Sequence, residues 1–346
     1  MMQDQARKQV VLWLSAGLLM VLMIVVVGGI TRLTHSGLSI VTWQPVKGVL
    51  PPLNEAQWHE AFEAYKQIPQ YKKVHHYFTL EDFKKIYFWE YFHRILGRLL
   101  GVVFFVFFTY FVLTRKIRTT ALFVRLSVIF LLGGLQGIAG WYMVSSGLVE
   151  NTSVDHVRLA IHLSLAMIIT GTIFWTILEL RYPVNEYHFV KLFKATRWLL
   201  ALVVVQIIYG ALTAGLKAGY IFPTYPLMGT KWLPDIIVEI FRREGLVSLF
   251  DFPATVQFIH RWLGLVISLM IIYYFLKFGK QLPEKLRFLL HLSVVLVTTQ
   301  FFLGVYTLVY KVPIPLAALH QTNAFLLFIN LLAVLYFSRN RQTRLL

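Results

Sequence analysis

The sequence contains no cysteine among its 346 residues. That absence excludes disulfides, iron–sulfur clusters and thiolate chemistry. Acidic residues are also few, because 16 Asp and Glu stand against 33 Lys and Arg, which gives a formal net charge of +17. Such a charge can indicate nucleic-acid binding, but the basic residues cluster at the ends of apolar runs, where they orient a membrane protein. We therefore expect no nucleic-acid partner.

Charged residues make up only 14% of the chain, whereas 58% of it is hydrophobic and the mean hydropathy is +0.65. Helices of about 20 apolar residues cross the hydrocarbon of a bilayer. We predict eight such spans, near residues 9–30, 88–113, 120–145, 156–180, 194–215, 254–277, 287–310 and 315–337. The first run follows MMQDQARK and lacks a small-residue cleavage site, so we expect a retained span and not a signal peptide. The predicted class is an all-α integral membrane protein.

The loops predict an orientation in the membrane. Lys and Arg flank every second link and both termini, whereas the links near 146–155 and 311–314 are poor in them. The positive-inside rule then places both termini in the cytoplasm. The lack of an Arg- and Ser-rich transit segment favours a bacterial inner membrane over an organelle. Two long segments, 31–87 and 216–253, are expected on the outer side.

The first outer segment contains two helix signals. Asn54 and Gln57 form a predicted capping box at the start of an amphipathic stretch, which we expect to lie on the membrane surface. Its apolar face carries Trp58, Phe62 and Tyr65. Thr79 and Asp82 form a second predicted capping box, and the helix that they begin is expected to run into the second span.

The two halves of the chain repeat each other. EYFHRILG matches QFIHRWLG, and LQGIAGWYMV matches TQFFLGVYTLV, which aligns Gln136 with Gln300 and Gly140 with Gly304. Each half is a unit of four spans, so both copies have the same orientation. We predict two tandem four-helix bundles, residues 1–185 and 186–346, related by a pseudo-two-fold axis along the membrane normal.

Four histidines lie one to two turns inside the outer ends of their spans. They are His93, His162, His260 and His320. Each is about 5 residues into its span, which places all four about 8 Å deep. Ionisable groups inside a membrane are costly and mark functional sites. Because two facing histidines can hold a haem iron from both sides, we predict one haem site in each half.

The neighbours of these histidines suit a flat ligand. Small residues mostly follow one and two turns later: Gly97, Gly101, Ala166, Thr170, Gly264, Ser268 and Ala324, with the bulky Phe328 as the exception. Close helix packing produces the same pattern. Arg94 and Arg261 directly follow two of the histidines, and we predict that they bind haem propionates. The alternative is that these arginines extend to lipid phosphates.

Three other histidines receive weaker predictions. His75 and His76 are adjacent in the outer segment and are expected to be solvated, although they could form an adventitious metal site. His156 precedes His162 by six residues and cannot share its helix face, so we expect it at most at an entrance.

The two halves differ on the face that carries the first histidine. Glu90 lies three residues before His93, and Gln257 occupies the matching position before His260. Residues three apart share a helix face, so only the first site has an ionisable carboxyl. We interpret the first half as reactive and the second as supporting. A structural hydrogen bond from Glu90 to a neighbouring helix is the alternative.

The motif GGITRLTHSGLSIVTWQPVKGVLPPLNEAQW, followed by EYFHRILGR, FIHRWLG and LHQTNA, resembles the haem A synthases of the Cox15/CtaA family over nearly the whole chain. The resemblance implies an eight-span oxidoreductase that converts the C8 methyl group of haem O to the formyl group of haem A. It implies that His93 and His162 face the substrate haem, that Glu90 is catalytic, and that His260 and His320 bind haem b. Some family members carry a cysteine pair in the outer loops, so this chain resembles the cysteine-free branch.

The resemblance also implies partners and leaves the mechanism open. Haem O would be delivered by haem O synthase, electrons would pass to an unidentified acceptor, and a homo-oligomer is compatible with the sequence. Either one histidine leaves the iron to open it for oxygen, or electrons leave through the macrocycle and water adds to a cationic carbon, with Glu90 assisting. The alternative functions are a dihaem b-type, quinol-oxidising electron-transfer subunit, in which Glu90 would be a proton exit, and, more weakly, a haem transporter.

Overall fold

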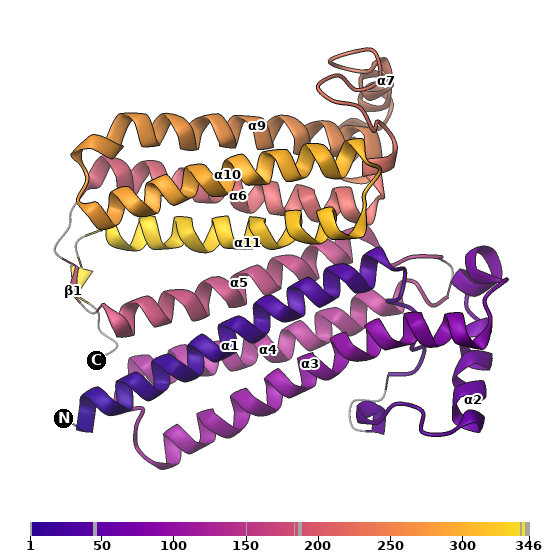
Figure 1. The fold of residues 1–346 in the computed structure, drawn as a ribbon, viewed down its shortest axis with the longest axis horizontal. Helices are drawn as coiled ribbons and strands as arrows, with labels where there is room; N and C mark the ends of the chain where they lie inside the picture. The colour runs from indigo at the N-terminus through magenta and orange to yellow at the C-terminus, as the bar shows by residue number, and fades with distance from the viewer. Residues whose placement is uncertain are drawn as a thin grey trace.

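The computed structural model describes residues 2–43, 47–149, 151–182, 184–185, 189–339 and 341–342. Within them, eight helices are long and apolar enough to cross a membrane. These are α1 (Met2–Leu33), α3 (Leu80–Leu113), α4 (Thr120–Ser145), α5 (His156–Arg181), α6 (Val190–Gly215), α9 (Pro253–Phe278), α10 (Glu284–Val309) and α11 (Ile314–Phe337). They run side by side in one bundle (Figure 1). The predicted all-α membrane fold and its eight spans are confirmed.

The helices pack in the same order in both halves. In the first half α1 packs on α3 and α5, and α4 packs on α5. In the second half α6 packs on α9 and α11, and α10 packs on α11. The halves meet where α5 contacts α6 and α11, and where α1 contacts α11. The division into units at residue 185 and the two-fold axis stay predictions, and residues 186–188 lie outside the described ranges.

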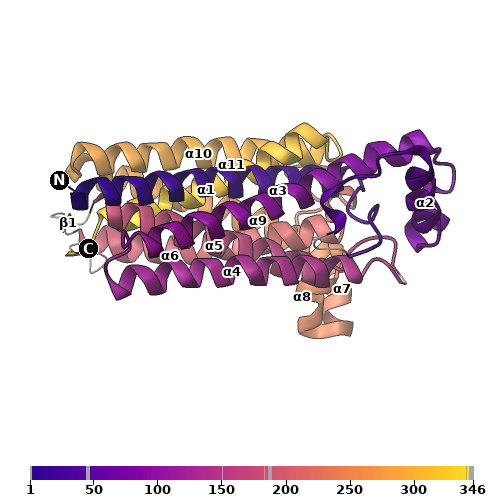
Figure 2. The same cartoon turned by 90° about the horizontal axis from the view of Figure 1, so that it is seen from below.

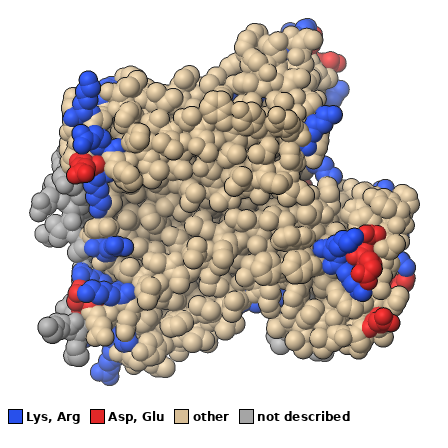
Figure 3. Space-filling model, viewed as in Figure 1, with Lys and Arg blue, Asp and Glu red and all other residues tan. Residues whose placement is uncertain are grey.

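The first and last described residues lie at one end of the bundle, where basic residues gather (Figures 1 and 3). The two-residue strands β1 (Val184–Asn185) and β2 (Arg341–Gln342) pair antiparallel there, and the short helix η5 (Gly279–Gln281) links α9 to α10. Figure 3 shows a broad band almost without charge between the two charged ends. Such a band suits contact with lipid hydrocarbon.

The opposite end carries the two long connecting segments, and α2 lies beyond the end of the bundle (Figure 2). The first segment contains η1 (Lys47–Val49), α2 (Glu55–Lys66) and η2 (Tyr71–His75). The second contains η3 (Ala218–Tyr220), α7 (Asp235–Glu244), η4 (Gly245–Val247) and α8 (Ser248–Asp251). These segments cover the end of the bundle nearest to the four histidines.

The cap at the start of α3 was predicted correctly. Asp82 N donates to Thr79 Oγ1 at 3.3 Å, and Thr79 N donates to Asp82 Oδ2 at 3.2 Å. The helix then continues without interruption into the second span. At α2, Gln57 N donates to Asn54 Oδ1 at 3.0 Å, but the Gln57 side chain accepts from the Leu53 amide instead of closing the predicted box.

The apolar face of α2 packs on protein and not on lipid. Phe62 and Tyr65 are buried, and their rings lie 5.1 and 5.3 Å from the ring of Phe83 on α3. Leu38 belongs to the same hydrophobic cluster. The prediction that this face lies on the membrane surface is therefore wrong, because the outer extension of α3 covers it. The segment between α1 and α3 is thereby fixed above the first-half histidines.

Candidate functional site

A cavity of about 1400 Å³ extends through both halves of the bundle. Its walls come from all eight long helices, and the four predicted histidines all line it: His93, His162, His260 and His320. A pocket for one small molecule usually measures about 300–1,000 Å³. The cavity is therefore large enough for more than one such ligand.

Each of these histidines lies against a glycine of the preceding membrane span. The pairs are Gly28 with His93, Gly140 with His162, Gly210 with His260, and Gly304 with His320. A Cβ atom added to these glycines would lie 3.0, 3.0, 3.2 and 2.9 Å from the imidazole, which is closer than ordinary packing. Sequence comparison aligned Gly140 with Gly304 but missed this role. The sequence did contain the signal for it, because Gly210 of the second half corresponds to Gly28 of the first, as Gly304 corresponds to Gly140.

The second-half pair has the separation of two ligands to one metal. The ring centres of His260 and His320 are 6.3 Å apart, and the ring planes are at 82°. Two bonds of about 2 Å from imidazole nitrogen to metal, with two ring radii of about 1 Å, add up to about 6 Å. Gln206 Nε2 donates to the backbone carbonyl of His260 at 2.9 Å, which fixes the part of α9 that carries His260. This geometry fits a haem iron.

Matched glutamines contact one histidine in each half. Gln136 Nε2 lies 3.3 Å from His162 Nε2, and Gln300 Nε2 lies 3.4 Å from His320 Nε2. In the second half Asn323 Nδ2 also donates to Gln300 Oε1 at 2.8 Å. Gln136 Oε1 is buried without a partner among the described residues. The second-half amide is thus held from both sides, and the first-half amide is not.

Glu90 is buried in the cavity wall and accepts three hydrogen bonds. Its Oε2 accepts from Ser39 Oγ at 2.7 Å and from Ile40 N at 2.8 Å. Its Oε1 accepts from Arg94 Nη2 at 2.7 Å. Glu90 thus makes structural hydrogen bonds, but two come from the outer segment and one from Arg94 on the same helix, and not from a neighbouring helix as considered from the sequence. They hold the carboxylate in a single position beside the first-half site.

Gln257 occupies the matching place in the second half with fewer contacts. Its Nε2 donates to the Phe222 carbonyl at 3.2 Å. Its Oε1 is buried and has no partner within the described ranges. The sequence difference between Glu90 and Gln257 therefore corresponds to two kinds of group. At the first site both carboxylate oxygens accept hydrogen bonds, and at the second only the amide nitrogen has a hydrogen-bond partner among the described residues.

The two arginines anchor the outer segments in parallel ways. Arg94 Nη1 donates to the Thr42 carbonyl at 3.3 Å, and Arg261 Nη2 donates to the Thr224 carbonyl. Arg94 also has the Glu90 carboxylate as an anionic partner. In contrast, Arg261 Nη1 is buried with no partner in the part of the chain that is described. A propionate role therefore fits Arg261 more directly than Arg94.

Buried polar atoms without a protein partner gather around the cavity. Among the described residues they include Gln136 Oε1, His162 Nδ1, Gln206 Oε1, Thr213 Oγ1, Gln257 Oε1, His260 Nδ1, Arg261 Nη1, Thr307 Oγ1 and His320 Nδ1. Buried polar groups in native proteins nearly always have a hydrogen-bond partner. These atoms therefore fit a large ligand that brings its own polar groups, as haem does. The described residues contain no cluster of three or more His, Cys, Asp or Glu for a bare metal ion.

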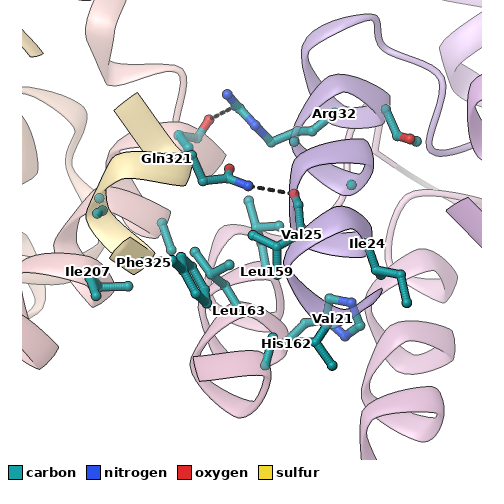
Figure 4. Close-up of a pocket in the computed structure, with 18 of the residues that line it drawn as sticks. Val21, Ile24, Val25, Arg32, Leu159, His162, Leu163, Ile207, Gln321 and Phe325 are labelled. Carbon is teal, nitrogen blue, oxygen red and sulfur yellow. Dashed lines mark hydrogen bonds between the residues drawn. The ribbon is translucent and has the colours of Figure 1, made fainter. Parts of the chain in front are cut away.

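Two hydrogen bonds join the halves beside the cavity (Figure 4). Gln321 Nε2 on α11 donates to the Val25 carbonyl on α1 at 2.7 Å. Arg32 Nη1 on α1 donates to the Ala214 carbonyl on α6 at 2.7 Å. Because these bonds cross from one half to the other, they fix the two histidine pairs relative to each other.

Of the three histidines with weaker predictions, His75 needs correction. His75 is buried and not solvated, because α2 covers it and its Nδ1 lies 2.7 Å from Tyr65 Oη. Burial, with the charges of His35 and Lys217, lowers the pKa of His75 to about 4. His76 is exposed, as predicted. His156 does not line the cavity, and its Nε2 lies 2.9 Å from Asp251 Oδ1.

Comparison with known proteins gives consistent matches over most of the chain. The model of the family described as cytochrome oxidase assembly protein matches residues 11–332. A haem A synthase of Parvibaculum lavamentivorans is 42% identical over 316 residues, which is 91% of this chain and 90% of that protein. One from Flavobacterium johnsoniae is 41% identical over 324 residues, 92% and 95% of the two chains. One from Nitrosospira multiformis is 43% identical over 328 residues, 93% and 91% of the two chains.

Proposed function

The chain belongs to the cytochrome oxidase assembly protein family, and we propose from this membership that it is a haem A synthase of the bacterial inner membrane. It oxidises the C8 methyl group of haem O to the formyl group of haem A. One methyl group and one water give one formyl group, four protons and four electrons, which pass to an electron acceptor. The dihaem electron-transfer alternative has no support, because the relatives are named haem A synthases.

The observation that best supports the assignment of roles is the contrast between Glu90 and Gln257. The first site places a carboxylate, held by three donors, in the cavity wall that His93 also lines. A fixed carboxylate can accept a proton in the reaction, whereas an amide cannot. His93 and His162 accordingly hold the substrate haem O, and Glu90 accepts a proton from the water that supplies the oxygen. Arg94 keeps this carboxylate in place.

The second half holds haem b between His260 and His320. Haem b supplies one-electron redox chemistry when bound. The spacing of the two rings supports this role. So does Arg261 Nη1, which has no partner among the described residues and would donate to a propionate. Asn323 and Gln300 fix the surroundings of His320, as suits a permanent cofactor.

The basic end of the bundle faces the cytoplasm in this proposal, together with both termini. The support is the gathering of Lys and Arg at that end (Figure 3). The histidine pairs then lie toward the outer side of the membrane. Haem O reaches the first-half site from haem O synthase.

The test of the function is production of haem A in cells. The chain is expressed with a haem O synthase in a host that lacks its own haem A synthase, and extracted haems are identified by chromatography and mass. We expect haem A. Recovery of haem O and haem B alone, with the protein present in the membrane, would contradict the proposal.

A further inference from the structure

The cavity reaches the side of the bundle in the first half. Between α3 and α4, five large apolar residues both line it and are 51–65% exposed: Val102, Phe105, Leu131, Leu135 and Ile138. In α9 and α10 the large apolar residues at the matching positions, Leu269, Ile272, Val295 and Phe302, are also exposed but do not line the cavity. The apolar residues of these two helices that do line it, such as Ile267 and Val297, are buried or half-buried. The first-half site therefore communicates with the lipid-facing surface, and the second-half site does not.

Glycines keep this side opening clear. A Cβ atom built on any of five glycines would meet nothing within 4 Å: Gly97 and Gly101 on α3, and Gly133, Gly134 and Gly137 on α4. The repeat that aligns Gln136 with Gln300 places Val297, Thr298 and Phe301 at the positions of the three α4 glycines. Gly97 corresponds to Gly264, whose added Cβ would lie 3.0 Å from Gln206 Nε2. Val297 and Phe301 line the cavity in the second half and fill space that the glycines leave open in the first, whereas Thr298 is exposed and does not line it.

The opening starts at the histidine level and extends deeper into the bundle. Gly140 contacts His162, and the exposed wall residues of α4 lie between that glycine and Phe130. Ten residues of helix span about 15 Å, a length that suits the extended farnesyl chain that haem O carries as a substituent. The walls are apolar, as an isoprenoid chain in a bilayer requires.

We propose that the opening between α3 and α4 holds the isoprenoid tail of the substrate haem and admits the haem from the bilayer, with Gly133, Gly134 and Gly137 as its specificity-determining residues. The inference rests on the proposed function, which makes the first-half ligand a tailed haem that must enter and leave. A resident haem b, which has no such tail, needs no side opening. Selectivity comes from shape, because lipid is as apolar as the walls and burial from lipid adds little.

Two variants test this by giving the first half the residues of the second. Gly133→Val and Gly137→Phe, each in the full chain with its second-half haem in place, are titrated with haem O and with iron protoporphyrin IX in phosphatidylcholine nanodiscs. We expect about tenfold weaker binding of haem O, the size of a typical overpacking effect. Binding of the tail-less iron protoporphyrin IX stays within about twofold of the unmodified chain.

One control accompanies these variants. Val295→Phe adds an aromatic ring on the exposed side of α10, where the cavity does not reach, and leaves the affinity for haem O unchanged. Retention of the second-half haem spectrum reports correct folding. If Gly137→Phe fails this check, Gly133→Val alone decides.

Unchanged haem O affinity in the correctly folded variants would overturn the inference, as would equal losses for both haems. Because the readout is binding without turnover, it is separate from the proposed function. An unmodified chain that makes no haem A, while the variants lose haem O selectively, would refute the function and leave the tail site standing.

Discussion

Glu90 and Arg94 form a buried ion pair one helical turn apart on α3, with 2.7 Å between Oε1 and Nη2 and side chains that are 3% and 11% exposed. The same carboxylate accepts hydrogen bonds from Ser39 and Ile40, so the pair joins the outer segment to the membrane helix. A charged group at this depth is stable only because its partners replace water. The same partners therefore fix the position of the Glu90 carboxylate and stabilise its charge.

Replacing Glu90 with Gln removes the proposed proton acceptor and preserves the side-chain volume. We expect haem A formation to fall by about 100-fold or more, the usual contribution of a general base, while haem content stays near normal. Haem extracted from membranes and normalised to protein measures both. Glu179→Gln, at a buried carboxylate near Arg125 at the other end of the bundle, serves as the control and retains activity. Equal amounts of haem A from the Glu90→Gln variant and from the unmodified chain would rule out Glu90 as the proton acceptor.

Replacing Arg94 with Met leaves the Glu90 carboxylate buried without its cation. Breaking a buried pair in this way destabilises a protein by about 3–5 kcal/mol. The double variant Arg94→Met with Glu90→Gln removes both charges, and we expect it to recover most of this loss. Unfolding in a denaturing detergent titration compares the stability of these two variants with that of the unmodified protein. If Arg94→Met were as stable as the unmodified protein, the ion pair would have no structural role.

Gly304→Ala tests the glycine contacts of the histidines. The added Cβ would lie 2.9 Å from the His320 ring, so we expect the ring to move and haem b occupancy to fall by at least about half. Gly17→Ala on α1 adds the same atom where nothing lies within 4 Å, and its haem content stays normal. Reduced-minus-oxidised spectra give the occupancy. Normal spectra in both variants would show that the close contact is tolerated.

His260→Ala separates the two haem sites. We expect complete loss of the b-type signal of the second half, because one of the two proposed iron ligands is removed. Binding of haem O by the first half remains, since His93 and His162 are unchanged. Titration of the purified variant with haem O measures binding at this remaining site. Persistence of the original b-type spectrum would refute the assignment of His260.

Acidification should loosen the outer segment. His75 has a pKa of about 4 when folded, against an ordinary value of 6.5, so the unfolded segment binds a proton that the folded one does not between these values. Stability that is present above pH 6.5 is therefore lost as the pH falls toward 4. The groups facing His75 are Tyr65, His35 and Lys217. Limited proteolysis of α2 against pH measures this, with His75→Phe expected to flatten the profile and the exposed His76→Gln expected to leave it unchanged.

Hydrophobic runs and the internal repeat were enough to predict the eight spans and the four cavity histidines. Both signals are local or directly comparable between halves, and burial in a membrane leaves few alternatives to a helix. The contrast of Glu90 with Gln257 was visible for the same reason. The family resemblance then supplied the chemistry, which the residue pattern alone did not distinguish from electron transfer.

Contacts that depend on where a connecting segment lies were not predictable in this way. His75 looked solvated because its sequence neighbours are polar, but α2 covers it after packing on Phe83. The hydrogen bonds from Ser39 and Ile40 to Glu90 join residues about fifty positions apart. Arg94 was assigned to a propionate because its partner Glu90 was considered separately.

The most direct test of the division into a reactive and a supporting half is the identity of the haem in each site of the Glu90→Gln variant. The variant is co-expressed with a haem O synthase, purified, and its haems are extracted and identified by mass. We predict one haem B and one haem O per chain, with haem A absent. Haem A in the variant at the level of the unmodified chain would contradict the assignment.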